Sequence, residues 1–206
     1  MKKTTLYITR HGQTEWNVAK IMQGHHDSPL TELGVSQVTW LSESLSHIDF
    51  AAIYSSSTLR ARRTAEILRR QRSLEVVAHD HLCELYMGEW EGQKYGELEE
   101  RYPEAFSAFW NNPHLFKPVN GGESYYDLQE RVLPLLKTII ARHEGEEVLI
   151  VTHAGTLKMI LGYLGKRPLA DLWKPPVIEP TGLCKVVIED GRATIELYGD
   201  TSHYRL

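Results

Sequence analysis

The sequence predicts an α/β fold: a three-layer α/β/α arrangement with a mainly parallel sheet, an antiparallel edge strand and a mostly helical insertion. Apolar, β-branched stretches of strand length alternate with segments of helical patterning, three of these stretches run into polar clusters, and a hairpin pattern closes the chain. A length of 206 residues suits one domain. We therefore expect a single domain over residues 1–206, with the insertion at about 80–122.

The predicted parallel strands share one feature, which is that each ends at polar residues. They are residues 4–9, followed by Arg10 and His11; residues 51–54, followed by Ser55 to Arg60; and residues 148–152, followed by His153. In open parallel sheets, ligands bind at the carboxyl ends of the strands. The three polar clusters are therefore expected to meet at one edge of the sheet and to form a site there.

The helical segments are marked by capping residues and apolar stripes. They are predicted from Thr31 with Leu33, Val38, Leu41 and Leu45 on one stripe, over 59–70, from Ser124 to about His143 with Pro134 inside, and from about Thr156. Short helices interrupted by Pro103 and Pro113 are expected in the aromatic-rich insertion. The closing hairpin pairs residues 184–189 with 193–198 through the turn Asp190-Gly191.

Composition excludes some classes of partner. The net charge of −4 gives no broad basic field, so we expect neither a nucleic acid nor a membrane surface as partner. No apolar run reaches the length of a bilayer span, and the apolar stretch at residues 6–8 is far too short for a signal peptide. The two cysteines, Cys83 and Cys184, have no CxxC spacing, which favours a reduced, cytoplasmic setting.

The loop after the first strand carries groups that suit an oxyanion. Arg10 supplies a fixed cation, His11 an imidazole and Asn17 an amide donor. An isolated Arg-His pair bonded to neighbouring carbonyls is the alternative for this segment alone. Arg60 falls in the first turn of a helix, where free N–H groups favour an anion, so a guanidinium is unfavourable there unless a negative group lies nearby. Arg62 and Arg63, by contrast, are expected on a solvated face.

Four motifs, in order, resemble those of the histidine phosphatase, or phosphoglycerate mutase-like, superfamily. They are Arg10-His11-Gly12-Gln13-Thr14-Glu15-Trp16-Asn17, the segment from Ser55 to Ala65, Leu82-Cys83-Glu84-Leu85-Tyr86-Met87-Gly88-Glu89-Trp90-Glu91-Gly92, and Val151-Thr152-His153-Ala154-Gly155. The run Gly121-Gly122-Glu123-Ser124 is similar to a further element of that family, and Gly199 to His203 is similar to a tail that folds back near the site.

The resemblance implies a role for each matching residue and places the helical insertion over the active site. His11 is the phosphorylated nucleophile, Glu84 the proton donor and His153 the residue that completes the catalytic set. Arg10 and Arg60 bind the phosphoryl oxygens, and Asn17, Gln23 and Gly24 are further phosphate contacts. His203 receives no catalytic role. Glu89, Glu91 and the run at 97–100 are expected on solvated faces.

These assignments predict a phosphatase that hydrolyses small phosphate monoesters with broad specificity. No metal or other cofactor is expected, because two arginines and a second imidazole can neutralise the phosphoryl charge. The expected partner is a small phosphorylated metabolite, and the chain is expected to be a monomer or a homodimer. Glu84 must be protonated while His11 is neutral. The aromatic residues of the 106–116 segment are expected to serve packing, with one or two at the mouth of the pocket.

Three alternatives remain open at this point. A metal site could use His25 and His26 with His79 and His81, although no HExxH pattern is present. A cofactor-dependent phosphoglycerate mutase would use the same His11 chemistry; Leu85-Tyr86-Met87-Gly88 replaces the Arg and Tyr-Gly that such mutases typically carry after the acid. A catalytically inactive phosphate-binding protein is disfavoured because every expected catalytic position is filled.

Overall fold

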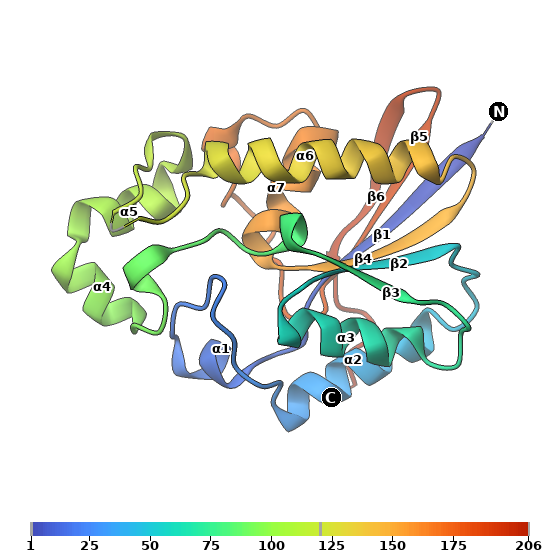
Figure 1. Ribbon diagram of the computed structural model, residues 1–206, viewed down its shortest axis with the longest axis horizontal. Helices are drawn as coiled ribbons and strands as arrows, with labels where there is room; N and C mark the ends of the chain where they lie inside the picture. Colours follow the sequence, from blue (N-terminus) through green and yellow to red (C-terminus); the bar gives the residue numbers. More distant parts are fainter. Residues whose placement is uncertain (1, 120, 206) are drawn as a thin grey trace.

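A single six-stranded sheet forms the centre of the computed structural model, which describes residues 2–119 and 121–205 (Figure 1). The strand order is β3-β2-β4-β1-β5-β6. The strands are β1 (Lys3–Arg10), β2 (Ala52–Ser56), β3 (Val76–His79), β4 (Glu147–Thr152), β5 (Leu183–Glu189) and β6 (Arg192–Asp200). β3, β2, β4 and β1 pair in parallel, and β5 is antiparallel to both β1 and β6. This confirms the predicted mainly parallel sheet with an antiparallel hairpin at one edge.

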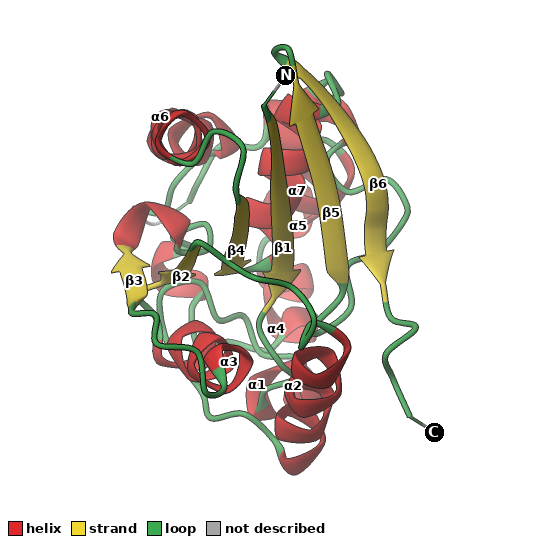
Figure 2. Cartoon of the chain, turned by 90° about the vertical axis from the view of Figure 1, so that its right-hand side faces the viewer, coloured by secondary structure: helices red, strands yellow, loops and turns green. Residues whose placement is uncertain are grey.

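Helices cover both faces of the sheet, so the expected three layers are confirmed (Figure 2). The helices are α1 (Glu15–Ala19), α2 (Glu32–Ser44), α3 (Leu59–Arg69), α4 (Tyr95–Arg101), α5 (Pro103–Asn111), α6 (Tyr125–Arg142) and α7 (Ala154–Leu164). In β4, Val148 and Ile150 pack in the cluster that includes α6 and α7 residues, whereas Leu149 and Val151 pack with α2 and α3. Because successive side chains of a strand point to opposite faces of the sheet, the sheet divides the hydrophobic core into two parts.

Both predicted N-caps, Thr31 and Ser124, begin a helix, whereas α7 begins at Ala154, two residues before the predicted start. The Thr31 side chain accepts a hydrogen bond from the Gly34 N–H at the start of α2, and Ser124 forms a capping box with Asp127 at the start of α6. Pro134 lies within α6, which continues through it to Arg142. Leu33 was predicted on the buried stripe, but its side chain is exposed, so the stripe begins further along α2.

The insertion is mostly helical, as predicted, with short 3-10 helices at Asp80–Leu82, Gly88–Trp90 and Pro113–Leu115 around α4 and α5. Figure 1 shows α4 and α5 beyond the carboxyl ends of the parallel strands, on the same side as α1. The aromatic residues of this segment pack around Trp90, whose ring lies about 6 Å from those of Phe106, Phe109 and Phe116. The sequence did not predict α1 or the edge strand β3, both of which are short and carry little periodic signal.

The tail follows β6 and returns to the carboxyl end of β1. The His203 Nε2 lies 3.0 Å from the hydroxyl of Thr181, whose backbone N–H donates to the carbonyls of Arg10 and His11. His203 therefore contacts the site indirectly. Within residues 2–119 and 121–205, no helix combines the length and apolar character needed to cross a membrane.

Candidate active site

All eight residues predicted for the site line one cavity of about 310 Å³ at the carboxyl ends of β1, β2 and β4. They are Arg10, His11, Asn17, Gln23, Gly24, Arg60, Glu84 and His153. They come from five separate stretches of the chain. Their convergence follows from the parallel sheet, whose strands deliver their last residues to the same edge.

His11 follows β1 and is 3% exposed. Its Nδ1 lies 2.8 Å from the carbonyl oxygen of Gly12, which can only accept a hydrogen bond, so Nδ1 carries the proton. Its Nε2 accepts a hydrogen bond of 3.3 Å from Nε of Arg60 and is therefore the unprotonated nitrogen. Burial, and then the positive charges of Arg60 and Arg10, lower the pKa of His11 well below 6.5. The ring is thus a neutral imidazole with a lone pair, as a nucleophile requires.

Arg60 lies in the first turn of α3 and is almost fully buried. Its Nη1 donates to Asp27 Oδ1 at 3.1 Å and to the His26 carbonyl at 2.7 Å, and its Nη2 donates to the Gly24 carbonyl at 2.7 Å. Asp27 also accepts hydrogen bonds from the backbone N–H groups of Leu59 and Arg60. Asp27 is therefore the negative group that a guanidinium at a helix N-terminus requires, and it caps α3 as well.

His153 precedes α7 and faces His11, with the two ring centroids 5.2 Å apart. Its Nδ1 lies 3.1 Å from Nη2 of Arg60, and because a guanidinium only donates, Nδ1 is the acceptor. Its Nε2 then donates to the hydroxyl of Ser56 at 2.8 Å. Burial, followed by the charge of Arg60, lowers the pKa of His153 well below 6.5. In this state His153 is neutral and orients Arg60.

Arg10 ends β1 and donates from Nη1 to the carbonyl of Ile178 at 2.9 Å. Its Nε is buried and has no hydrogen-bond partner within the described residues. An unpaired buried donor is costly unless a ligand satisfies it. The guanidinium is therefore placed to bind an anion beside His11.

Glu84 is 8% exposed and is held by the start of α7. Its Oε2 accepts from the Gly155 N–H at 2.9 Å, and its Oε1 accepts from the Thr156 N–H at 3.1 Å and from its neighbour Leu85. Gly155 is required for this approach, since a Cβ there would lie 2.7 Å from Oε1. These backbone donors fix the positions of both carboxyl oxygens at the start of α7.

An ion pair behind Glu84 fixes the main chain that carries it. Arg131 of α6 binds both carboxylate oxygens of Glu123, at 2.7 and 2.9 Å, and donates to the carbonyls of His81, Cys83 and Glu84. Burial opposes ionisation of Glu123, but hydrogen bonds from Arg131 and the Tyr86 N–H outweigh it and lower the pKa of Glu123. The side chain of Glu84 is thus held by α7 and its backbone by α6.

Gln23, Asn17 and Gly24 were predicted as further phosphate contacts. The first two have side-chain N–H donors that remain available, and the carbonyl of the third is bound to Arg60. The Gln23 Oε1 accepts from the hydroxyls of Thr14 and Ser28, which leaves its amide NH₂ to donate into the cavity. The Asn17 Oδ1 accepts from the Thr14 N–H in a capping box, so its NH₂ is likewise a remaining donor. Gly24 has φ +54° and turns its carbonyl to Arg60, so it positions the cation.

The prediction that Glu91 lies on a solvated face was wrong. Glu91 is 8% exposed and accepts hydrogen bonds from the backbone N–H groups of His25, His26 and Met87. It therefore holds the loop that supplies Gly24, His26 and Asp27 to Arg60. Glu89 is exposed, as predicted.

The outer part of the cavity is mostly apolar. Met87, Tyr95, Phe109 and Trp110 come from the insertion, and Trp173, Val177 and Ile178 come from the segment after α7. The prediction that one or two aromatic residues of the 106–116 segment reach the pocket is confirmed by Phe109 and Trp110, and Tyr95 lines the pocket as well. An alcohol group attached to a bound phosphate would lie against this wall.

Within the described parts of the chain, no group of three or more His, Cys, Asp or Glu residues is arranged to hold a metal ion. The histidines considered for a metal site have other contacts. His25 lies with Nε2 3.0 Å from the Glu84 carbonyl, and the rings of His79 and His81 lie against each other.

The family model of the histidine phosphatase superfamily (branch 1) matches residues 6–201. The chain belongs to the histidine phosphatase superfamily. This membership confirms the family predicted from the four motifs, and the chain is a phosphatase that acts on phosphate monoesters.

Named relatives cover nearly the whole histidine phosphatase domain. The chain is 33% identical to the metal-independent phosphoserine phosphatase of Arabidopsis thaliana, over 97% of this chain and 83% of the relative. It is 31% identical to the adenosylcobalamin/alpha-ribazole phosphatase of Salmonella typhimurium, over 97% and 98%. The solved structure of Bacillus stearothermophilus YhfR superposes with a TM-score of 0.93 and 42% identity, over 97% and 98% of the two chains.

Sequence reasoning missed several residues that complete this phosphatase site. Asp27 was signalled only indirectly, by the need for a negative group near Arg60. Arg131 lies in a helix with no local pattern that points to the site, although its partner Glu123 belongs to one of the motifs. The segment 173–178, which forms part of the apolar wall of the cavity, carries no motif. It contacts the site through the Ile178 carbonyl, which accepts a hydrogen bond from Arg10.

Proposed function

We propose that this phosphatase acts on a range of small phosphate monoesters through a phosphohistidine on His11, with Glu84 as the acid and base. The observation that supports this proposal most directly is the neutral His11 ring, which lines the cavity and whose unprotonated Nε2 lies beside Arg60. Arg10, Arg60, Gln23 and Asn17 bind the phosphoryl oxygens.

In the first step, the lone pair of His11 Nε2 attacks phosphorus and the bond from phosphorus to the alcohol oxygen breaks. The positive charges of Arg10 and Arg60 stabilise the negative charge on the three phosphoryl oxygens. In the second step, water attacks the phosphohistidine, inorganic phosphate leaves and the His11 ring becomes neutral again.

Glu84 delivers a proton to the departing alcohol oxygen and later accepts one from the attacking water. Backbone N–H groups of Gly155 and Thr156 fix the positions of its two oxygens in the substrate-free site.

The proposed breadth of substrate rests on the apolar wall of the cavity, which offers few groups that select one alcohol by hydrogen bonding. The two relatives named above carry names for chemically different substrates, a phosphoamino acid and a ribazole phosphate, so neither name transfers to this chain. A cytoplasmic setting and a monomeric or homodimeric state are parts of the same proposal, and both cysteines are free and buried.

The decisive experiment replaces Glu84 by Gln, which keeps the size and cannot deliver a proton. We expect the single-turnover phosphorylation rate to fall about 10²- to 10⁴-fold for glycerol phosphate, and by less than about tenfold for p-nitrophenyl phosphate, whose alcohol leaves unaided. Glu89→Gln is the matched control because Glu89 is exposed. Equal losses on both esters, or acid-labile label that persists in His11→Ala, would show that the assigned roles are wrong.

The phosphoglycerate mutase alternative is tested with the same protein. Leu85-Tyr86-Met87-Gly88 stands where a mutase typically carries an Arg and a Tyr-Gly. Incubation of 3-phosphoglycerate with 2,3-bisphosphoglycerate is therefore expected to yield inorganic phosphate. Rapid formation of 2-phosphoglycerate would establish the mutase instead.

A further inference from the structure

One buried cation at the site has no part in the phosphoryl chemistry. Lys158 is 3% exposed and lines the active-site cavity together with Ala154, one helical turn before it on the same face of α7. Long side chains on a helix lean toward its N-terminus. For α7 this direction leads to His153, about 7.5 Å along the helix axis from Lys158.

The charges of the cavity are divided unevenly. Among its described lining residues, the phosphoryl end holds Arg10, Arg60 and Glu84 with the two histidines, and Lys158 is the one formally charged residue outside that group. The rest of the outer wall is mainly apolar. Any anionic group on the alcohol part of a substrate would therefore find its cation at Lys158.

The ammonium of Lys158 is incompletely satisfied. Its Nζ donates to the Lys174 carbonyl at 2.8 Å and lies 5.7 Å from the centroid of the Tyr198 ring. It forms no ion pair with a carboxylate of the described chain. An ammonium has three N–H donors, so two remain for a ligand. A buried cation without a counterion is costly, and an incoming anion would remove that cost.

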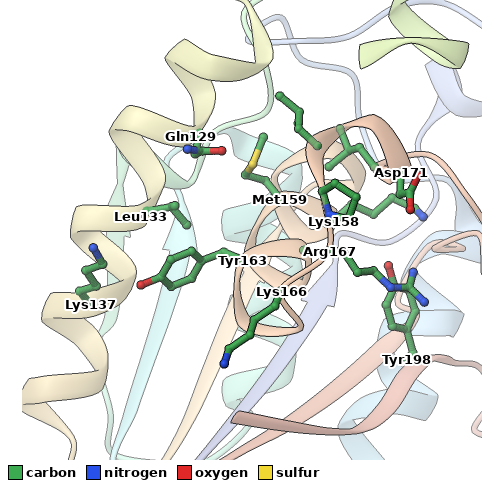
Figure 3. Close-up of a pocket in the computed structure, with 14 residues that line it drawn as sticks. Gln129, Leu133, Lys137, Lys158, Met159, Tyr163, Lys166, Arg167, Asp171 and Tyr198 are labelled. Atoms are coloured by element: carbon green, nitrogen blue, oxygen red, sulfur yellow. The ribbon is translucent and has the colours of Figure 1, made fainter. Parts of the chain in front are cut away.

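Lys158 also lines a second cavity of about 660 Å³, which Figure 3 shows, and it is the one described residue that lines both cavities. Figure 3 shows Arg167 beside Lys158, and both cations lie over the Tyr198 ring. Burial, followed by the charge of Arg167, lowers the pKa of Lys158 to about 8, with Cys184 acting in the opposite direction. Asp171 also lines the second cavity, but it pairs with Lys174. The neighbours of Lys158 thus leave its charge available to a substrate.

We propose that Lys158 is a specificity-determining residue that binds a carboxylate on the alcohol part of the substrate. This inference rests on the phosphatase function proposed above and narrows its preferred substrates to small phosphorylated hydroxy or amino acids. A carboxylate fits better than a second phosphate, because one ammonium with two free donors matches a single negative charge and two oxygens.

The test compares O-phosphoserine with phosphoethanolamine, which lacks only the carboxylate. We expect Lys158→Met to lower kcat/KM for phosphoserine about 10- to 100-fold, the range for a hydrogen-bonded charge. The expected change for phosphoethanolamine is less than about threefold. Lys158→Arg keeps the charge and is expected to retain most of the preference. Thermal unfolding of both variants checks that the fold is intact.

The pH dependence gives an independent readout. As the pH rises through about 8, Lys158 loses its proton, so the wild-type preference for phosphoserine is expected to fall, whereas Lys158→Met shows no such change. A wild-type enzyme that hydrolyses both esters equally well would overturn the inference and leave the phosphatase function standing. Equal losses on both esters in Lys158→Met would also overturn it, because they would assign Lys158 to holding Lys174 and the wall beside it. Failure of the wild type on every ester, p-nitrophenyl phosphate included, would instead refute the proposed function.

Discussion

Arg131→Met is the change that best tests whether a residue remote from the phosphate sets the position of the acid. Arg131 supports Glu84 only through the main chain, by its pair with Glu123 and its bonds to the carbonyls of His81, Cys83 and Glu84. Methionine keeps much of the stem and removes all of these donors. The expected defect is therefore one of positioning, with the phosphate-binding residues untouched.

The magnitude follows from the burial of the pair. Removing one partner of a buried ion pair costs about 3–5 kcal/mol. The side chains of Arg131 and Glu123 are 15% and 21% exposed, so solvent screening reduces this to about 2–3 kcal/mol of unfolding free energy. For a domain of this size each kcal/mol lowers Tm by about 2–4 °C, so the expected fall is about 4–12 °C. A displacement of Glu84 by about 1 Å can cost on the order of 10²-fold in rate.

The assay pairs thermal unfolding with single-turnover phosphorylation by glycerol phosphate and by p-nitrophenyl phosphate. We expect the larger loss of rate on glycerol phosphate, because only the alkyl ester needs the proton of Glu84. Arg142→Met is the control, since Arg142 lies on the same helix and is exposed. Glu123→Gln combined with Arg131→Met should cost less than the sum of the single changes. Equal losses on the two esters, or additive effects of the two substitutions, would refute this account of Arg131.

Two further predictions concern the protonation of the site and the fit of the acid. His11 and His153 are expected to show the NMR shifts of neutral imidazoles at pH 6.5, and imidazolium shifts at that pH would contradict this. The free energy of unfolding is expected to fall as the pH drops below about 6.5, because the unfolded chain then binds protons that the folded histidines do not. Gly155→Ala is expected to displace Glu84 and to lower the rate on glycerol phosphate about 10²-fold. The control Gly162→Ala, whose new Cβ would have its nearest neighbour 4.0 Å away, should leave the rate unchanged.

The parts of the fold that the sequence predicted are those with a strong local signal. The central strands carry continuous apolar runs because β1 and β4 are buried on both faces, and α2 and α6 carry side-chain caps. β3 was missed because it lies at the edge of the sheet, where Ala78 and Val77 are exposed and no apolar alternation is needed. Propensity alone does not identify such a strand.

The site was predicted to the extent that its residues lie in motifs. Position in a motif does not reveal burial, which is why Glu91 was assigned to a solvated face although three backbone N–H groups surround its carboxylate. Asp27 and Arg131 act across 33 and 47 residues of sequence, on Arg60 and Glu84 respectively, so no local pattern could reveal them. Only the folded chain brings these supporting charges to the residues they hold.

The proposed mechanism also has a consequence for the hydrogen bond between His11 and Arg60. The lone pair of the His11 Nε2 accepts a hydrogen bond from Nε of Arg60, so the proposed nucleophile is paired with the cation that is proposed to bind the phosphate. A phosphoryl oxygen is a stronger acceptor than a neutral imidazole because it is charged. In the proposed mechanism we expect Arg60 to exchange the His11 nitrogen for a phosphoryl oxygen when substrate binds, while its Nη1 stays on Asp27 and the His26 carbonyl. The guanidinium would then need no large movement, and the lone pair of His11 would be released only when phosphorus is in place.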